Sequence, residues 1–304
     1  MIVPHERHVG RLLTYVGMPL VLLLGYDLAV VVAYKVLRWD WVAMPHIPLA
    51  LFGSAIGIIV AFRNQSSYAR WWDARTLWGS VINNSRSVAR QVTTVMMPLN
   101  DNEAGELKTM QRRLVYHQIA FAHALRQQLR GLEPWEELTP LLSEQELSEL
   151  REEKNIPLTI QQQMGTLLRE CQVRGWIDIS HWRALDRNLD DLTDAQGGTE
   201  RIKNTPMPKQ YDYFPQLFVH IYCTLLPLAL VTSMGWLTPL GSTLVGFIFL
   251  ALDKIGRDLE DPFENTIYDV PLTAITTTIE VNLRQLLGET IFPPTEKPIR
   301  RVLW

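Results

Sequence analysis

The sequence of 304 residues predicts an all-α membrane protein, in which four membrane-spanning helices are joined to a cytosolic layer of helices. Four apolar stretches reach or approach the roughly 20 residues that a helix needs to cross a bilayer core. The mean hydropathy is +0.00, although 47% of the residues are hydrophobic. This value is the average over an apolar part of the chain and a strongly polar part. Neither an alternating strand pattern nor an internal repeat is present.

The four apolar stretches form two hairpins. The first pair occupies residues 12–37 and 42–62, and the intervening Trp39 and Trp41 suit an interfacial aromatic belt. The second pair occupies residues 214–236 and 237–252, where Gly235 and Pro239 mark a tight turn and the last stretch is short. Buried helices of a large soluble protein could look similar, but two such hairpins in one chain favour the membrane.

The predicted organisation alternates between membrane and cytosol. Residues 1–62 carry the first two spans, residues 63–212 form a cytosolic helical region, residues 213–253 carry the last two spans, and residues 254–304 form a C-terminal helix and an extended tail. By the positive-inside rule, the basic residues near the spans place the polar region and both termini in the cytoplasm. These residues are His5, Arg7, His8, Arg11, Arg63, Arg70, Arg75, Lys203, Lys209, Lys254 and Arg257.

Two features bear on this topology. Lys35 and Arg38 lie at the opposite end of the first span and run against the rule, although both side chains can snorkel outward from a helix end. The N-terminal residues 1–11 have no signal-peptide cleavage pattern, so the first span is expected to stay in the protein.

The cytosolic region is predicted to be helical throughout. An amphipathic stripe indicates a helix over residues 102–130 that ends at Gly131. Ser143 and Glu146 form a capping box. Three further helices are expected, over residues 157–175, over residues 178–196 with a glycine stop at 197–198, and over residues 270–289. The tail at 292–304 is too rich in proline for a helix and is expected to lie extended on its own or a neighbouring subunit.

Composition and motifs argue against several classes of function. A net charge of -3 provides no basic footprint for nucleic acid. The seven histidines form no metal-binding pair of the H-E-x-x-H type, and no phosphate-binding loop or nucleophile motif occurs. We therefore expect neither an enzyme nor a bound cofactor or metal. Cys171 and Cys223 are too few and too far apart in sequence to indicate a disulfide framework.

The second span carries the strongest candidate site. Ser54, Ile58 and Phe62 recur every four residues and therefore share one helix face. If several copies surround an axis, these side chains become rings that form an apolar constriction able to gate by dewetting. The alternative is that Ile58 and Phe62 face lipid or a neighbouring helix.

Two other features could carry transport chemistry. Asp27 is a carboxylate inside a span, for which we favour a structural hydrogen bond over a role in ion binding. Aromatic residues gather just after the second span, with Arg70, Asp73 and Arg75 between them, and favour subunit packing over a ligand cage. These aromatic residues are Tyr68, Trp71, Trp72 and Trp78.

The same segment resembles a known family. The string FRNQSSYARWWDAR at residues 62–75, followed by Trp78, Gly79 and Asn83, is similar to the segment after the second membrane helix of bestrophins, especially bacterial ones. Residues 261–265 (DPFEN) resemble the N-P-F segment of the family, and residues 269–288 resemble its bacterial continuation. The resemblance covers nearly the whole chain. It implies a homopentameric ion channel of the bacterial inner membrane, with one axial pore, a hydrophobic neck on the second helix and a cytoplasmic vestibule.

The resemblance also assigns individual residues. Placed by the Arg-Trp-Trp anchor, the three neck positions fall on Ser54, Ile58 and Phe62, and the small Ser54 implies a wider or wetter upper neck. A second, cytoplasmic constriction is expected ahead of the third span, for which Ile177 is our candidate. The acidic run that forms a calcium clasp in eukaryotic bestrophins is interrupted here at residues 264–268, so calcium gating is not expected.

The expected ligands and partners follow from the same resemblance. Likeness to bacterial bestrophins favours monovalent cations such as sodium, with a chloride or other anion channel of the same architecture as the alternative. A carrier with alternating access and a non-conducting membrane scaffold are the alternatives from other classes. The expected partners are further copies of the chain, membrane lipid and the permeant ions, with no nucleic acid.

Overall fold

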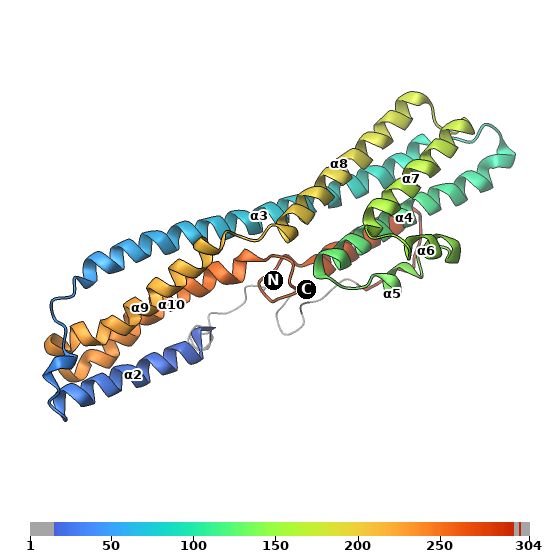
Figure 1. The fold of residues 1–304 in the computed structure, drawn as a ribbon. Helices are drawn as coiled ribbons and strands as arrows, with labels where there is room; N and C mark the ends of the chain where they lie inside the picture. The colour runs from blue at the N-terminus through green and yellow to red at the C-terminus, as the bar shows by residue number, and fades with distance from the viewer. Residues whose placement is uncertain (1–14, 295–297, 299–304) are drawn as a thin grey trace. The chain divides into compact units, whose positions relative to one another are not determined.

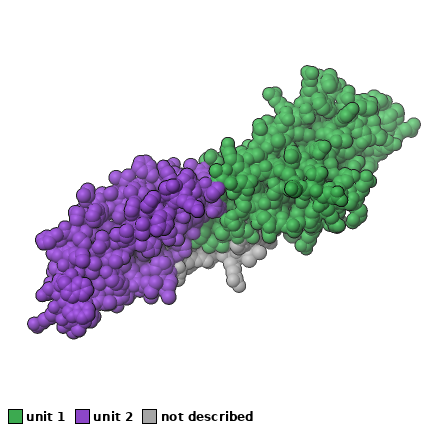
Figure 2. All heavy atoms as spheres, viewed as in Figure 1, with its two compact units in different colours: residues 1–3, 72–205, 262–304 green, residues 4–71, 206–261 purple. Residues whose placement is uncertain are grey.

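The computed structural model describes residues 15–294 and residue 298, and every element within them is helical (Figure 1). The chain divides into two compact units, drawn in green and purple in Figure 2. Unit 1 comprises residues 1–3, 72–205 and 262–304, and unit 2 comprises residues 4–71 and 206–261. The basic N-terminal residues 5–11 and most of the predicted tail at 292–304 lie outside the described residues.

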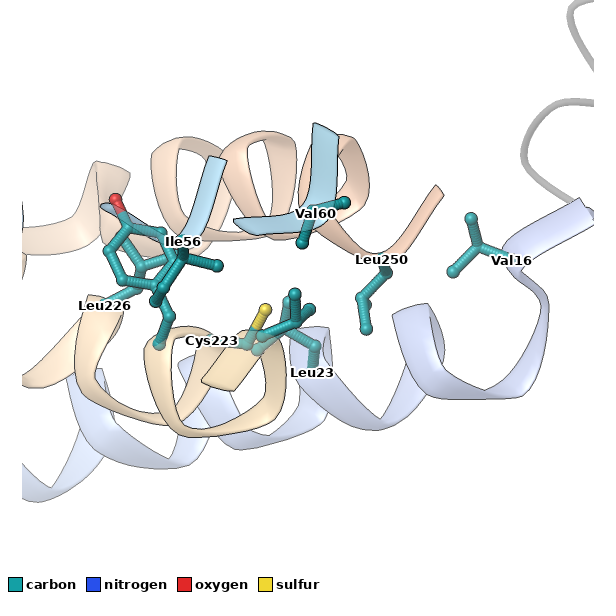
Figure 3. Packing of buried hydrophobic residues seen from close by; sticks show 9 residues of the cluster. Val16, Leu23, Ile56, Val60, Cys223, Leu226 and Leu250 are labelled. Carbon is teal, nitrogen blue, oxygen red and sulfur yellow. The ribbon is translucent and has the colours of Figure 1, made fainter. Parts of the chain in front are cut away.

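Unit 2 contains the apolar helices. It comprises α2 (Met18–Lys35), the first part of α3 (Leu49–Val95), α9 (Lys209–Met234) and α10 (Thr238–Glu260). The 3₁₀ turns η1 (Asp40–Val42) and η3 (Gly235–Leu237) lie within its two connections. Leu23 of α2, Ile56 and Val60 of α3, Leu226 of α9 and Leu250 of α10 form its apolar core (Figure 3).

Three helical stretches are long and apolar enough to cross a membrane. They are Met18–Lys35, Leu49–Val95 and Lys209–Glu260. The third stretch includes η3, which separates α9 from α10 at the turn predicted from Gly235 and Pro239. Length and apolar composition therefore support the predicted membrane layer.

The helices that carry the predicted spans differ from them at their ends. The second helix begins at Leu49 rather than at residue 42, because Pro45 and Pro48 disfavour helical backbone before them. The fourth predicted span, residues 237–252, lies in a longer helix, because α10 has 23 residues and continues past the apolar stretch to Glu260. Its polar last turns stay helical because their side chains find partners on other segments: Arg63 donates to Asp253, and Tyr15 donates to Asp258.

Unit 1 is built around α4 (Ala104–Arg130), which packs against α5 (Trp135–Leu138), α7 (Ile156–Val173), α8 (Ile179–Asn204) and α11 (Leu272–Leu286). The 3₁₀ turn η2 (Asp101–Glu103) precedes α4. Gly131 has a φ of 68°, the left-handed conformation of a helix C-cap, which confirms the predicted end of this helix.

The predicted capping box is confirmed in α6 (Glu144–Leu150). The backbone N–H of Ser143 donates to Glu146 Oε2 at 2.8 Å, and the backbone N–H of Glu146 donates back to Ser143 Oγ at 3.4 Å. Arg113 of α4 donates to the same carboxylate at 2.7 Å. Burial alone would raise the pKa of Glu146, but hydrogen bonds from His117 and Ser143 hold it well below its usual range. The carboxylate therefore joins α6 to α4 as well as capping its own helix.

The prediction that glycines 197 and 198 end a helix is wrong. Helix α8 continues through both to Asn204. A Cβ atom at position 198 would lie 2.7 Å from Leu77 Cδ2, so this glycine allows α8 to approach α3 closely inside unit 1. Helix α11 is shorter than predicted, ending at Leu286 just before Gly288, whose φ is 76°.

Candidate functional site

In unit 2, helix α3 has one buried face and one uncovered apolar face. Ile56 and Val60 are buried in the apolar core, whereas Ile58 is 59% exposed and Phe62 is 66% exposed. Ser54 is also exposed, and its Oγ donates to the carbonyl of Ala50 at 2.8 Å. The structure thus places the three predicted neck residues on the uncovered face of α3.

Close packing fixes the rotation of α3 in unit 2. A Cβ atom at Gly53 would lie 2.7 Å from the hydroxyl oxygen of Tyr222 on α9, so the glycine allows this close approach. The Tyr222 ring in turn packs edge-on against Phe249 of α10, with 4.8 Å between the ring centroids. The helix cannot turn its uncovered face toward α9 without disrupting these contacts.

Directly after Phe62 lies a buried ionic cluster, which we call the Arg63 cluster: Arg63, Asp212, Asp253, Arg257 and Glu260. Arg63 is fully buried. Its Nη1 donates to the Asp253 backbone carbonyl at 2.9 Å and to Asp253 Oδ1 at 3.0 Å, and its Nη2 donates to Asp212 Oδ1 at 2.6 Å. Arg257 Nη2 lies 2.9 Å from the second Asp253 oxygen, and Glu260 lies 3.6 Å from Arg63.

Neighbouring contacts extend this anchor along α3. Asn64 Nδ2 donates to the carbonyl of Leu252 at 2.9 Å, and Arg70 Nε donates to the carbonyl of Glu260 at 2.7 Å. A Cβ atom at Gly256 would lie 2.2 Å from Asn64 Oδ1, so α10 passes very close to this turn of α3. The cluster therefore joins α3 to α9 and α10 immediately below Phe62.

In the sequence, Arg63 serves only as a marker of orientation, and its role in this cluster is not predicted. The available signal was an arginine directly after an apolar run, together with Asp212 and Asp253 at the ends of the third and fourth spans. A buried arginine needs carboxylate partners, and these aspartates lie at the matching ends of the neighbouring helices.

Asp27 makes the structural hydrogen bonds that we predicted. Its side chain is fully buried, and it accepts hydrogen bonds from Ser242 Oγ at 3.0 Å and from Thr243 Oγ1 at 2.9 Å. Both hydroxyls belong to α10, so the carboxylate joins α2 to α10.

Ile177 lies in the connection between α7 and α8 of unit 1 and is only 4% exposed. The backbone N–H of Met97 donates to the backbone carbonyl of Trp176 at 3.0 Å. This hydrogen bond holds the connection against the end of α3. Ile179, the first residue of α8, is 53% exposed. Of these two apolar side chains, Ile179 has the surface available to line an opening.

Acidic residues around the DPFEN segment lie near basic or hydroxyl side chains. Asp258 accepts from the hydroxyl of Tyr15, Asp261 lies 3.8 Å from Arg70, and Glu264 lies 2.5 Å from Lys203. Within the described part of the chain, no group of three acidic, histidine or cysteine side chains has the geometry of a metal site. The predicted aromatic cluster is divided, since Trp78 is buried in unit 1 while Tyr68 and Trp72 are about half exposed.

Comparison with known proteins decides the family. The profile described as "Bacterial/Fungal Bestrophin protein" matches residues 7–285. The chain belongs to the bestrophin family. This confirms the resemblance drawn from residues 62–75 and 261–288.

Related sequences and a solved structure agree with this assignment. This bestrophin is 34% identical over 285 residues to the Salmonella typhi protein named "Voltage-dependent anion channel-forming protein YneE", covering 92% of this chain and 90% of that one. It is 34% identical over 242 residues to a Ralstonia nicotianae protein with the same type of name, covering 80% and 77% of the two chains. The crystal structure of a bacterial bestrophin homologue from Klebsiella pneumoniae matches with a TM-score of 0.82 at 32% identity, covering 90% of this chain and 98% of that one.

Proposed function

We propose that this bestrophin is a homopentameric ion channel of the bacterial inner membrane, which passes monovalent ions through one axial pore. The observation that carries the proposal is the uncovered apolar face of α3, formed by Ser54, Ile58 and Phe62 and anchored by the Arg63 cluster. Five such faces turned toward a common axis would cover one another and form a hydrophobic neck. The names of the Salmonella and Ralstonia relatives as channel-forming proteins support the same function.

The proposed topology has four membrane crossings with both termini in the cytoplasm. Helix α2, the first part of α3, α9 and α10 supply the crossings, and unit 1 supplies the cytosolic vestibule. Its partners are membrane lipid and four further copies of the chain. No enzymatic activity and no nucleic-acid binding belong to this proposal. The carrier alternative needs broken helices around a central site, whereas α9 is a single helix through both Pro215 and Pro227.

For selectivity we favour monovalent cations such as sodium. Helical periodicity continues the face of Phe62 through Ser66 and Ala69 to Asp73, which lies about three turns further along α3 and is exposed. In a pentamer this position would form a ring of five carboxylates, a device typical of cation-selective pores. The anion-channel names of the relatives favour the alternative of a chloride channel with the same architecture.

Planar-bilayer recording of purified protein tests this proposal. We expect single-channel steps. In a sodium chloride gradient, the reversal potential should have the same sign as the equilibrium potential of sodium. Asp73→Asn should move the reversal potential toward zero, and Ser80→Ala, at another position on the continuing face, is the neutral control. A reversal potential of the sign set by chloride would establish the anion alternative. Flux without single-channel steps would establish a carrier.

Assembly gives an independent prediction. In mild detergent we expect conducting samples to have five times the chain mass of 35.0 kDa. The physical reason is that the neck exists only when several copies of α3 surround one axis, so conduction requires the assembled ring. Native mass spectrometry of the fractions used for recording measures this mass. A stable one-chain or two-chain species in conducting fractions would contradict the axial pore.

Calcium should not control the current. A calcium site needs six to eight oxygen ligands, and the acidic run is interrupted at residues 264–268. Of the acidic residues before it, Asp258 accepts a hydrogen bond from Tyr15, Glu260 lies 3.6 Å from Arg63, and Asp261 lies 3.8 Å from Arg70. Currents recorded with micromolar calcium and with a chelator should therefore be the same within error, with added magnesium as the control for divalent charge. Loss of current on chelation that only calcium restores would show that these carboxylates form a site.

A further inference from the structure

A pocket of about 350 Å³ opens in unit 2 where the start of α2 meets α9 and α10. One wall is apolar and consists of Val16, Pro19 and Leu250. Val16 and Leu250 also belong to the apolar core cluster of unit 2 (Figure 3). The pocket is therefore built on packed helices rather than on a loop.

The rest of the lining is polar and mainly basic. Lys254 and Arg257 lie one turn apart on α10, His220 and Gln216 lie one turn apart on α9, and Asp258 is the acidic member. Two permanent positive charges thus face the pocket beside one carboxylate. That carboxylate is already engaged, because it accepts the hydrogen bond of the Tyr15 hydroxyl.

The two basic side chains are held in place but keep donors available. Lys254 Nζ donates to the Tyr15 carbonyl at 2.6 Å and lies 4.5 Å from the centroid of the Tyr15 ring. An ammonium group has three N–H donors, so this bond leaves others for a ligand. Arg257 contacts Asp253 through Nη2. A guanidinium group has five N–H donors, so this half-exposed side chain keeps others available for a ligand.

We propose that this pocket binds the headgroup of an anionic phospholipid of the cytoplasmic leaflet, with its phosphate on Lys254 and Arg257. The inference rests on the membrane topology of the proposed function, in which the last turns of α10 lie at the inner membrane surface. Ammonium and guanidinium groups are strong donors to phosphate oxygens. Basic pockets between membrane helices at this depth suit lipid headgroups. The apolar wall of Val16, Pro19 and Leu250 lies beside the basic one, where it would receive the start of the acyl chains.

The location of the pocket predicts what binding does to the protein. The phosphate would join α10 to the start of α2, next to the contacts that Tyr15 makes with Lys254 and Asp258. Arg257 also contacts Asp253 of the Arg63 cluster, so a bound phosphate would stabilise the contacts that hold α3 to α10. Occupancy should therefore raise the thermal stability of the protein.

Thermal unfolding of the purified full-length protein in mild detergent tests the proposal. The added probes are dioctanoyl phosphatidylglycerol, dioctanoyl phosphatidylcholine and inorganic phosphate, each at matched concentrations. We expect the unfolding midpoint to rise with phosphatidylglycerol, and to stay unchanged with the zwitterionic lipid and with phosphate. Lys254→Gln together with Arg257→Gln should weaken the apparent affinity for phosphatidylglycerol at least tenfold. Arg201→Gln together with Lys209→Gln removes the same charge outside the pocket and should leave it unchanged.

Several outcomes would overturn the proposal. They are an equal shift with phosphatidylcholine, an equal shift with inorganic phosphate, and a full phosphatidylglycerol effect in the double variant. If the double variant does not fold, Lys254→Gln alone, which keeps the contact between Arg257 and Asp253, must show the weakened binding. The readout is independent of ion flow. A conducting protein without lipid preference refutes this inference alone, and a lipid-binding protein that never conducts refutes the proposed channel alone.

Discussion

Replacing Arg63 with alanine should destabilise unit 2 by about 3–5 kcal/mol, because it removes the buried partner of the buried Asp253 carboxylate. Asp253 is fully buried and would keep only Arg257, and Asp212 would lose its 2.6 Å ion pair. Arg63→Lys should rescue little, since one ammonium cannot reproduce the guanidinium fork that donates through both Nη1 and Nη2. The midpoint of thermal unfolding in detergent and the yield of assembled protein measure the effect.

Two further variants separate this cause from general damage. Arg90→Ala removes an exposed arginine from the same helix and should shift stability by less than about 0.5 kcal/mol. Adding Asp253→Asn to Arg63→Ala should recover part of the loss, because the largest unpaired charge is then gone. A wild-type midpoint for Arg63→Ala would show that the Arg63 cluster is not what holds α3 to α9 and α10.

Features that depend on local backbone chemistry could be predicted from the sequence. The end of α4 at Gly131 requires only a left-handed residue after an amphipathic stripe. The capping box of α6 requires only Ser143 and Glu146 three residues apart. The turn between α9 and α10 likewise follows from Gly235 and Pro239 alone. Each of these signals lies within a few residues of the feature it determines.

Features that depend on distant partners could not be predicted in this way. Gly198 looks like a helix stop in sequence, but its role is set by Leu77, which lies 121 positions earlier and occupies the space of a Cβ atom. The polar end of α10 looks like a connection until Asp253 meets Arg63. Ile177 and Ile179 are equally apolar in sequence, and only the packing of the α7–α8 connection shows that the first is buried and the second exposed. In each case the deciding contact is a long-range one.

Truncating Phe62 should give the largest gain of current. Five phenyl rings projecting toward an axis leave a bottleneck in which an ion sheds water without gaining ligands, and this cost sets the barrier. If Phe62→Ala removes about 1.4 kcal/mol of that barrier, the current rises about tenfold. Phe62 is 66% exposed within the chain, so its loss removes little packing inside unit 2. The pentamer should therefore remain intact, which mass measurement on the recorded sample verifies.

The other two positions on this face supply matched controls. Ile58→Ala should raise the current by a smaller factor, since Ile58 is the smaller obstruction one turn away. Ser54→Ala should change little, because that ring is already small and its hydroxyl bonds to the Ala50 carbonyl of its own helix. This order, with Phe62 first and Ser54 last, separates a neck from a lipid-facing stripe, on which all three truncations would leave the current unchanged. A folded, pentameric Phe62→Ala protein that conducts no better than the parent would place the limiting barrier elsewhere. The exposed Ile179 at the start of α8 would then be the next position to truncate, with the buried Ile177 as its control.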